Sequence, residues 1–261
     1  DKEFSAKLKI IKKDDETKKP VLVAGTEFKI YDLDHKKYVE QVTTYPTVTV
    51  HKSFFTDSQG YLILPKHLEI GHYRIEEVTA PDGYVVNKNY VEITVDSDTA
   101  YEVDGVSGDV IIEVSYEDQP VKGNLIVYKK GEMLSGFEND FIYEEQYLSG
   151  AEFEVRAAED ICTPDHQKDA DGNRIVLYAK DTLVATITTG ESGKAVAKDL
   201  PLGRYYVVET KAPEGFVLNP EPVTVALTYQ DQETPVVEAE AMVGNDRQKV
   251  SISVEKQDIE N

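Results

Sequence analysis

The sequence has a single cysteine, Cys162, among its 261 residues. A secreted domain that is held together by disulfides carries an even set of cysteines, so a disulfide framework within this chain is excluded. No histidine or aspartate stands directly beside Cys162. We therefore expect an incidental loop or edge residue rather than a nucleophile. If the protein is extracellular, something other than a disulfide must stabilise it.

Signals of catalysis and of membrane insertion are also missing. The sequence has no secretory signal, no sorting motif and no apolar run long enough to span a membrane. The five histidines show no metal-ligand spacing, and neither a phosphate loop nor a Ser/His/Asp signature is present. The stretch 169–173 resembles part of a calcium loop but lacks its full spacing, and it predicts a hairpin turn instead. We expect no metal, no cofactor and no turnover catalysis.

Positive charge is scarce. The net charge is −21 and the isoelectric point is about 4.6. Such a chain is repelled by nucleic acids and by anionic membrane surfaces, so neither is an expected partner. The acidic residues are typical of a well-solvated surface.

The most informative feature that is present is a repeated phrase. Gly71–Tyr84 returns without a gap as Gly203–Phe216, at an offset of 203 − 71 = 132 residues. The chain therefore contains two copies of one unit, and its length suits two domains that each have a core. Valine, threonine, tyrosine and isoleucine dominate the apolar runs, and no long stretch has a helical period, so an all-β fold is predicted.

The repeated phrase places an acidic residue on the apolar face of a strand. Residues of a strand that are two apart point to the same side. The residues that share this face are Tyr73, Ile75 and Glu77 in the first copy, and Tyr205, Val207 and Glu209 in the second. We therefore predict that Glu77 and Glu209 point inward, where an unpaired carboxylate is costly. Glu76 lies on the opposite face.

A lysine ends the first alternating run of each copy. Lys12 shares the phase of Leu8 and Ile10, and Lys129 shares the phase of Leu125 and Val127. Two alternatives stay open, because Lys13 also fits a Lys-x-Asp spacing through Asp15, and Lys130 lies beside Lys129.

The last strand of each copy ends in an acid or an amide. The inward residues are Val110, Ile112, Val114, Tyr116 and Asp118 in the first copy, and Val237, Ala239, Ala241, Val243 and Asn245 in the second. Each core should thus contain a lysine, a glutamate and an Asp or Asn. The plain interpretation is a buried, paired polar cluster, or exposure at strand ends.

The expected boundaries follow from the repeat. We predict one domain over 1–121, a second over 122–249 with an insertion near 132–149, and the start of a further repeat or a tail over 250–261. A strand is also expected within 39–50. The insertion contains the aromatic residues Phe137, Phe141, Tyr143 and Tyr147. We expect them to fold back over a sandwich edge, with an exposed ligand patch as the alternative.

These residues together resemble the Cna B-type, or SpaA-type, repeat of Gram-positive surface adhesins and pilins. The matching pieces are Lys12-Lys-Asp14-x-x-Thr17, Ala24-Gly-Thr-Glu-Phe28, the Tyr-x-hydrophobic-x-Glu-x-x-Ala-Pro-x-Gly-aromatic phrase in both copies, and Tyr116-Glu-Asp118-Gln-Pro120. The resemblance implies two tandem prealbumin-like, inverse immunoglobulin-type β-sandwich domains. It also implies an intramolecular isopeptide bond in each domain, between the first-strand lysine and the last-strand Asp or Asn.

The resemblance assigns roles to the candidate residues. Lys12 would attack Asp118 with Glu77 assisting, and Lys129 would attack Asn245 with Glu209 assisting. Two departures are visible, since Asp118 stands where Asn is commoner and Gly131 stands where the first copy has Asp14.

The implied function is a structural stalk segment of a cell-surface adhesin or pilin, and not an enzyme. The alternative is an adhesin module that contacts host matrix or glycan. Expected partners are neighbouring repeats, other pilin subunits and host extracellular matrix. We expect an extracellular fragment of a wall-anchored protein, with the anchor outside this sequence.

Overall fold

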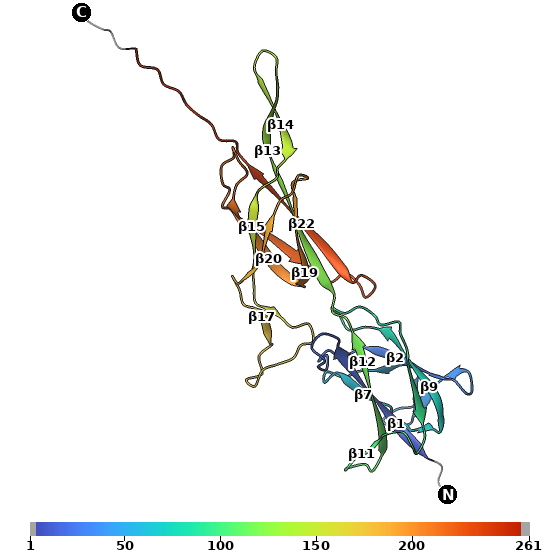
Figure 1. The fold of residues 1–261 in the computed structure, drawn as a ribbon. Coiled ribbons are helices and arrows are strands. Elements are labelled where there is room, and N and C mark those ends of the chain that lie inside the picture. Colours follow the sequence, from blue (N-terminus) through green and yellow to red (C-terminus); the bar gives the residue numbers. More distant parts are fainter. Residues whose placement is uncertain (1–3, 257–261) are drawn as a thin grey trace, which may run out of the picture.

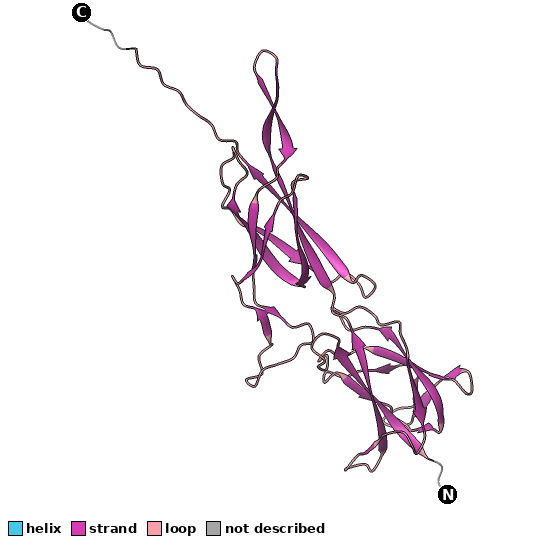
Figure 2. Ribbon diagram, in the orientation of Figure 1, coloured by secondary structure: helices cyan, strands magenta, loops and turns pink. Residues whose placement is uncertain are grey.

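The computed structural model describes residues 4–256, and these form strands and loops with no helix (Figure 2). The predicted all-β fold is confirmed. Over this range nothing helical is present that could cross a membrane.

The N-terminal half is a sandwich of two sheets. One sheet contains β1 (Ser5–Asp14), β7 (Tyr61–Ile63), β8 (Leu68–Glu69), β11 (Glu102–Val103) and β12 (Val110–Asp118). Its order is β11-β12-β1-β7, and β8 also pairs with β1. The facing sheet contains β2 (Glu27–Asp32), β3 (Lys37–Tyr38), β6 (Phe54–Phe55), β9 (Gly71–Thr79) and β10 (Val91–Val95). Its order is β10-β9-β2-β3, and β6 also pairs with β2.

The prediction of a single strand within 39–50 is wrong. The segment instead forms a small hairpin of β4 (Gln41–Thr43) and β5 (Thr49–His51). Pro46 lies between the two strands, and proline has no N–H to offer a sheet ladder, so it falls in the connection.

The C-terminal half repeats the sandwich. One sheet contains β13 (Lys122–Phe137), β14 (Phe141–Tyr147), β19 (Lys194–Pro201) and β22 (Val236–Asn245). Its order is β14-β13-β19, and β22 also pairs with β13. The facing sheet contains β15 (Glu152–Ala157), β18 (Leu183–Thr188), β20 (Gly203–Lys211) and β21 (Val223–Leu227), in the order β18-β15-β20-β21. The short strands β16 (Ile161–Cys162) and β17 (Val176–Tyr178) pair with each other.

The first and last strands of each half are parallel neighbours. β1 pairs with β12, and β13 pairs with β22, both in parallel register. A parallel pair makes the chain enter at one end of the sandwich and leave at the other. The two halves consequently follow one another along a line (Figure 1).

Each core lies between the two sheets of its own half. Its buried side chains include Leu8, Ile10, Phe28 and Ile75 in the first half, and Leu125, Val127, Phe153 and Val207 in the second. Each fully buried side chain of this size contributes about 1.5–3 kcal/mol. The alternation in the sequence therefore decides which side chains face the core.

The two halves are joined by a loop that reaches back from the second half. Asp165, between β16 and β17, is fully buried. Its carboxylate accepts a hydrogen bond from Thr17 Oγ1 at 2.8 Å, and its carbonyl accepts one from the Leu22 N–H at 2.8 Å. Gln167 Nε2 donates to the Pro20 carbonyl at 2.7 Å. The sequence did not predict this contact.

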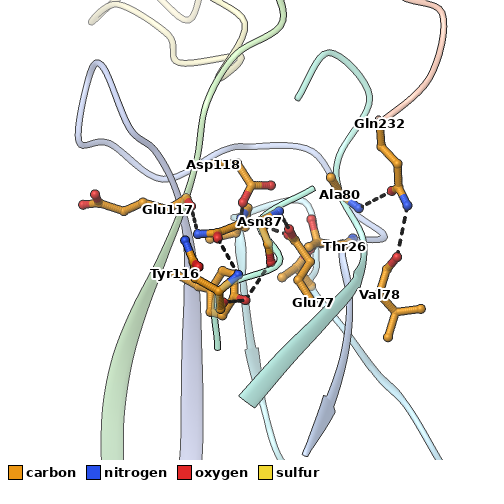
Figure 3. A network of polar contacts seen from close by, with 12 residues as sticks. Thr26, Glu77, Val78, Ala80, Asn87, Tyr116, Glu117, Asp118 and Gln232 are labelled. Carbon is orange, nitrogen blue, oxygen red and sulfur yellow. Dashed lines mark hydrogen bonds and ion pairs between the residues drawn. The ribbon is translucent and has the colours of Figure 1, made fainter. Parts of the chain in front are cut away.

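A second contact between the halves comes from Gln232. Its Oε1 accepts the Ala80 N–H at 2.9 Å, and its Nε2 donates to the Val78 carbonyl at 3.2 Å (Figure 3). The Val86 N–H donates to the Gln232 carbonyl at 3.0 Å. Contacts on two sides of the short join restrict hinge motion between the halves.

The expectation for the aromatic insertion is wrong for three of its four aromatic residues, whereas Tyr143 is half-buried with the Arg247 guanidinium 3.4 Å from its ring centre. Residues 132–147 extend β13 and β14 into a hairpin that projects beyond the sandwich (Figure 1). Phe137 is 65% exposed, Phe141 58% and Tyr147 51%. Pairing between the two strands satisfies the backbone of the hairpin, so it does not need to fold back onto the sheet.

The segment expected to open a further repeat forms no strand between residues 250 and 256. Residues 257–261 lie outside the described part of the chain.

Candidate functional site

The parallel strand register places a lysine beside an acid or an amide in each half. Lys12 on β1 lies opposite Tyr116 on β12, and Lys129 on β13 lies opposite Val243 on β22. In both pairs the candidate acceptor is two residues further along the last strand. Lysine and acceptor therefore share one strand face, the face that packs on the core.

In the first half the cluster comprises Lys12, Glu77 and Asp118, whose side chains are all 0% exposed. Lys12 Nζ lies 2.9 Å from Glu77 Oε1 and contacts Asp118 Oδ1. The predicted inward orientation of Glu77 is thus observed. Two carboxyl groups and one ammonium cannot all be charged cheaply without water.

The pKa of the Asp118 carboxyl is raised in this cluster. Burial raises this pKa to about 8, the Lys12 ammonium opposes the shift, and the Glu77 carboxyl adds to it. Within residues 4–256, no hydrogen-bond donor reaches Asp118 Oδ2. A buried oxygen without a partner costs about 1–3 kcal/mol, which favours the protonated acid.

In the second half the cluster comprises Lys129, Glu209 and Asn245. Lys129 Nζ lies 2.9 Å from Glu209 Oε1 and donates to Asn245 Oδ1. Asn245 Nδ2 donates to Glu209 at 3.0 Å for Oε1 and 2.8 Å for Oε2. Burial lowers the pKa of the Lys129 ammonium, and the nearby Glu209 carboxylate opposes this. Burial thus favours the neutral amine, which is the nucleophilic form.

An aromatic ring lies beside the lysine in both clusters. Lys12 Nζ lies 4.9 Å from the centre of the Tyr116 ring, and that ring packs edge-on against Phe28 at 5.1 Å. In the second half, Lys129 Nζ lies 5.9 Å from the Phe153 ring. Phe28 and Phe153 occupy equivalent positions on β2 and β15.

The alternative residues point away from the clusters. Lys130 forms an ion pair with Glu145 at 3.3 Å on the surface. Glu76 pairs with Arg74 and accepts a hydrogen bond from the Tyr38 hydroxyl at 2.8 Å. Lys13 lies on the partly exposed face of β1, whereas Lys12 is fully buried.

The missing aspartate of the second copy has a structural explanation. In the first copy, Asp14 accepts a hydrogen bond from the Tyr84 hydroxyl at 2.7 Å. In the second copy the corresponding residues are Gly131 and Phe216. A Cβ at Gly131 would overlap the Phe216 ring. The two copies thus differ at both positions, with a polar pair in the first and a ring packed on glycine in the second.

Two further residues of the site were not found from the sequence. The N–H groups of Asn87 and Asn219 donate to Glu77 Oε2 and Glu209 Oε2, each at 2.8 Å. The signal was present, because 219 − 87 = 132 matches the offset of the repeat. The two asparagines lie just beyond the repeated phrase.

The segment 169–173 forms a turn, as predicted. The Asp169 carboxylate accepts hydrogen bonds from the N–H groups of Asp171 and Asn173, both at 2.9 Å. Among the residues with described positions, no group of acidic, histidine or cysteine side chains is arranged to hold a metal ion.

The packing of Gly131 generates a prediction. Gly131→Ala should lower the free energy of unfolding of the second half by about 1–3 kcal/mol, because the new methyl group overlaps the Phe216 ring. Gly136→Ala is the matched control, since the nearest atom to its added Cβ is 4.0 Å away. Urea denaturation measures both. Adding Phe216→Leu should recover part of the loss, and equal losses for the two alanine variants would contradict this account.

Comparison with known proteins agrees with the fold. A family model described as the SpaA prealbumin-like fold domain matches residues 6–108 and again residues 142–242. A search of curated protein sequences finds no significant match.

Three solved structures align with most of this chain. The Bacillus anthracis TIE protein aligns with a TM-score of 0.55 and 22% identity, over 94% of this chain and 34% of that chain. A Streptococcal ancillary pilin aligns with a TM-score of 0.33 and 22% identity, over 94% of this chain and 63% of that one. The minor pilin GBS52 of Streptococcus agalactiae aligns with a TM-score of 0.33 and 15% identity, over 97% of this chain and 100% of that one. Since the two ranges matched by the family model cover most of the sequence, the chain belongs to the SpaA family of prealbumin-like fold domains and contains two of them in tandem.

Proposed function

We propose that this chain is a stalk segment of a bacterial surface adhesin or pilin, and that each domain is locked by an isopeptide bond that it forms itself. One observation carries the proposal. In both domains a buried lysine Nζ lies 2.9 Å from a glutamate and touches the side chain of an Asp or Asn on the parallel last strand. We place the division between the domains at residues 121 and 122, and the end of the second domain at 249.

The reaction in the second domain is an amide exchange. The neutral Lys129 amine attacks Cγ of Asn245, and a C–N bond forms while the bond to Nδ2 breaks. Glu209 accepts a proton from the attacking amine and delivers a proton to the departing nitrogen, which leaves as ammonia. Support comes from the hydrogen bonds that Asn245 Nδ2, the nitrogen that would leave, donates to both Glu209 oxygens.

The reaction in the first domain is a condensation. The neutral Lys12 amine attacks Cγ of protonated Asp118, the new C–N bond forms, and one carboxyl oxygen leaves as water. Glu77 transfers the proton. The raised pKa of Asp118 supports this route, because a carboxylate resists nucleophilic attack and a neutral acid does not. Each reaction occurs once per domain, so the chain is not an enzyme with turnover.

Such bonds would close long loops. They would join residues 118 − 12 = 106 and 245 − 129 = 116 positions apart. By the chain-entropy account of disulfides, closure of this length stabilises a domain by about 4–5 kcal/mol. A loop of 106 residues would extend by roughly 350–380 Å if the domain unfolded under tension, and a bond between first and last strands prevents this. The property suits a stalk exposed to pulling at the cell surface, with neighbouring repeats and pilin subunits as partners.

The two proposed bonds should be visible in the mass of the intact chain. The chain should weigh one water and one ammonia less than the mass calculated from its sequence, because each domain loses one small molecule. Lys12→Ala should restore the water alone, and Lys129→Ala the ammonia alone. Glu77→Ala and Glu209→Ala should each block one bond, whereas Lys13→Ala and Lys130→Ala are matched controls that change neither. A mass equal to that of the sequence would end the proposal for both domains.

The second prediction concerns pH. The reactive form of Asp118 is the protonated acid, so crosslinking of the first domain should slow as the pH rises above about 8. Asn245 has no proton to lose, and the second domain should show no decline at that point. Chain that has not yet folded is isolated in urea and diluted into buffers of different pH. Samples are quenched at intervals, and peptide mapping follows each bond separately. A parallel decline in both domains would exclude Asp118 as its cause.

A second candidate function is favoured by the projecting hairpin of residues 132–147. The rings of Phe137 and Phe141 pack against each other with their centres 5.3 Å apart, and both side chains remain exposed at the tip of the hairpin. Exposed aromatic clusters of this kind mark interaction sites on soluble proteins. An adhesin module that contacts host matrix or glycan through this hairpin is therefore the alternative.

The alternative has its own test. Phe137→Ser combined with Phe141→Ser should abolish adhesion to immobilised matrix proteins or glycans and leave the unfolding midpoint unchanged. Tyr45→Ser is the control, because Tyr45 is 89% exposed on the other domain. Equal binding by all variants would refute the adhesin alternative, and the stalk function would be the one that remains.

A further inference from the structure

Both assisting glutamates are held by the same residue type at the same distance along the chain. Asn87 and Asn219 each lie 10 residues after the glutamate, and each backbone N–H donates to its Oε2 atom at 2.8 Å. This leaves Oε1 facing the lysine in both domains. Figure 3 shows Asn87 between Glu77 and the last strand of the first domain.

The side chains of the same asparagines reach the strand that carries the acceptor. Asn87 Nδ2 donates to the Glu117 carbonyl at 2.8 Å, and Asn219 Nδ2 donates to the Gly244 carbonyl at 3.1 Å. Each carbonyl belongs to the residue directly before the acceptor. Because the peptide bond is rigid, fixing this carbonyl fixes the backbone from which the acceptor side chain projects.

The other end of each side chain closes a local turn. Asn87 Oδ1 accepts the N–H of Asn89 at 3.0 Å, and Asn219 Oδ1 accepts the N–H of Glu221 at 3.1 Å. The turn fixes the rotamer that aims Nδ2 at the last strand. A short side chain with an acceptor and a donor at its two tips is required here, and asparagine is the residue that provides both.

We propose that Asn87 and Asn219 are positioning residues for crosslink formation. Each ties the glutamate carboxyl to the acceptor strand, so that the lysine, the glutamate and the acceptor stay in reacting geometry. The inference rests on the proposed isopeptide function and adds a residue to each site. Misplacement by about 1 Å costs on the order of 10²-fold in rate for reactions that depend on orientation.

The backbone hydrogen bond also fixes which carboxyl oxygen faces the lysine. The N–H of Asn87 or Asn219 occupies Oε2, and Oε1 is the atom 2.9 Å from the lysine in both domains. The glutamate is therefore held with one oxygen turned toward the amine.

The two domains should depend on their asparagine to different degrees. In the first domain the Tyr116 hydroxyl lies between the Asn89 carbonyl and the Asn87 carbonyl, the latter at 3.0 Å, and supports the same loop. In the second domain the equivalent position is Val243, which has no hydroxyl group. Asn219 thus holds its loop with less help.

The test uses the full chain, collected unfolded in urea and diluted into buffer, with each crosslink followed by peptide mapping. Asn87→Asp keeps the size of the side chain and the turn acceptor but replaces the donor with an oxygen that faces a carbonyl. We expect at least about 10-fold slower crosslinking in the first domain and an unchanged rate in the second. Asn219→Asp should do the reverse, with the larger effect. Asn89→Asp, the same change at an exposed position two residues away, should match the unsubstituted chain.

A pH readout separates positioning from general destabilisation. The carboxyl that Asn87→Asp introduces has an ordinary pKa of about 3.9, so at about pH 4 close to half of it is protonated, and its O–H can donate to the Glu117 carbonyl. The rate of Asn87→Asp relative to the unsubstituted chain should therefore recover as the pH falls from about 8 to about 4. Hydrogen exchange of β9 and β12 in a Lys12→Ala background, where no bond can form, checks that Asn87→Asp still folds.

The outcomes are distinguishable. No mass loss in the unsubstituted chain would refute the proposed function itself. Normal crosslinking there, with Asn87→Asp as fast as Asn89→Asp, would overturn the positioning role alone. A deficit that does not change with pH, or one accompanied by lost exchange protection, would make the role purely structural and would also overturn it.

Discussion

Parallel pairing of the first and last strands is the constraint on which the rest of each domain depends. It brings two ends of a long segment into register, with the lysine and the acceptor on one face of adjacent strands. Parallel neighbours need a long connection between them, and here that connection supplies the opposite sheet and the glutamate. The same pairing sends the chain out at the far end of the sandwich, so that one domain follows another in line (Figure 1). The position of the candidate cluster and the in-line arrangement of the domains thus share one cause.

The two copies reach the same geometry with different residues. Asp14 and Tyr84 form a polar pair in the first domain, and Gly131 packs against the Phe216 ring in the second. The acceptor is an acid in one domain and an amide in the other. The acid lacks a partner for one oxygen, whereas the amide satisfies both its oxygen and its nitrogen. Before any bond forms, the electrostatic energy of the first cluster is therefore less favourable than that of the second.

Much of this arrangement could be predicted from the sequence, because alternation determines which side of a strand meets the core. That rule placed Lys12, Lys129, Glu77 and Glu209 on inward faces. It could not place the hairpin, since whether exposed aromatics fold back depends on tertiary contacts and not on period. It also missed Asn87 and Asn219, because they lie in loops, where no strand period marks a residue as inward. The contact of Asp165 with the first domain was equally invisible, because it joins residues 165 − 17 = 148 positions apart.

The projecting hairpin has a mechanical consequence. β13 continues past Lys129 before the chain turns back, so the whole hairpin lies on the far side of the residue that would bond to Asn245. With that bond in place, a pull along the stalk would pass from β13 through the lysine side chain directly to the end of β22. Residues 130–244 would then form a side branch that carries no tension. A surface on this branch would keep its shape, and its affinity for anything bound to it, at any force that the stalk survives.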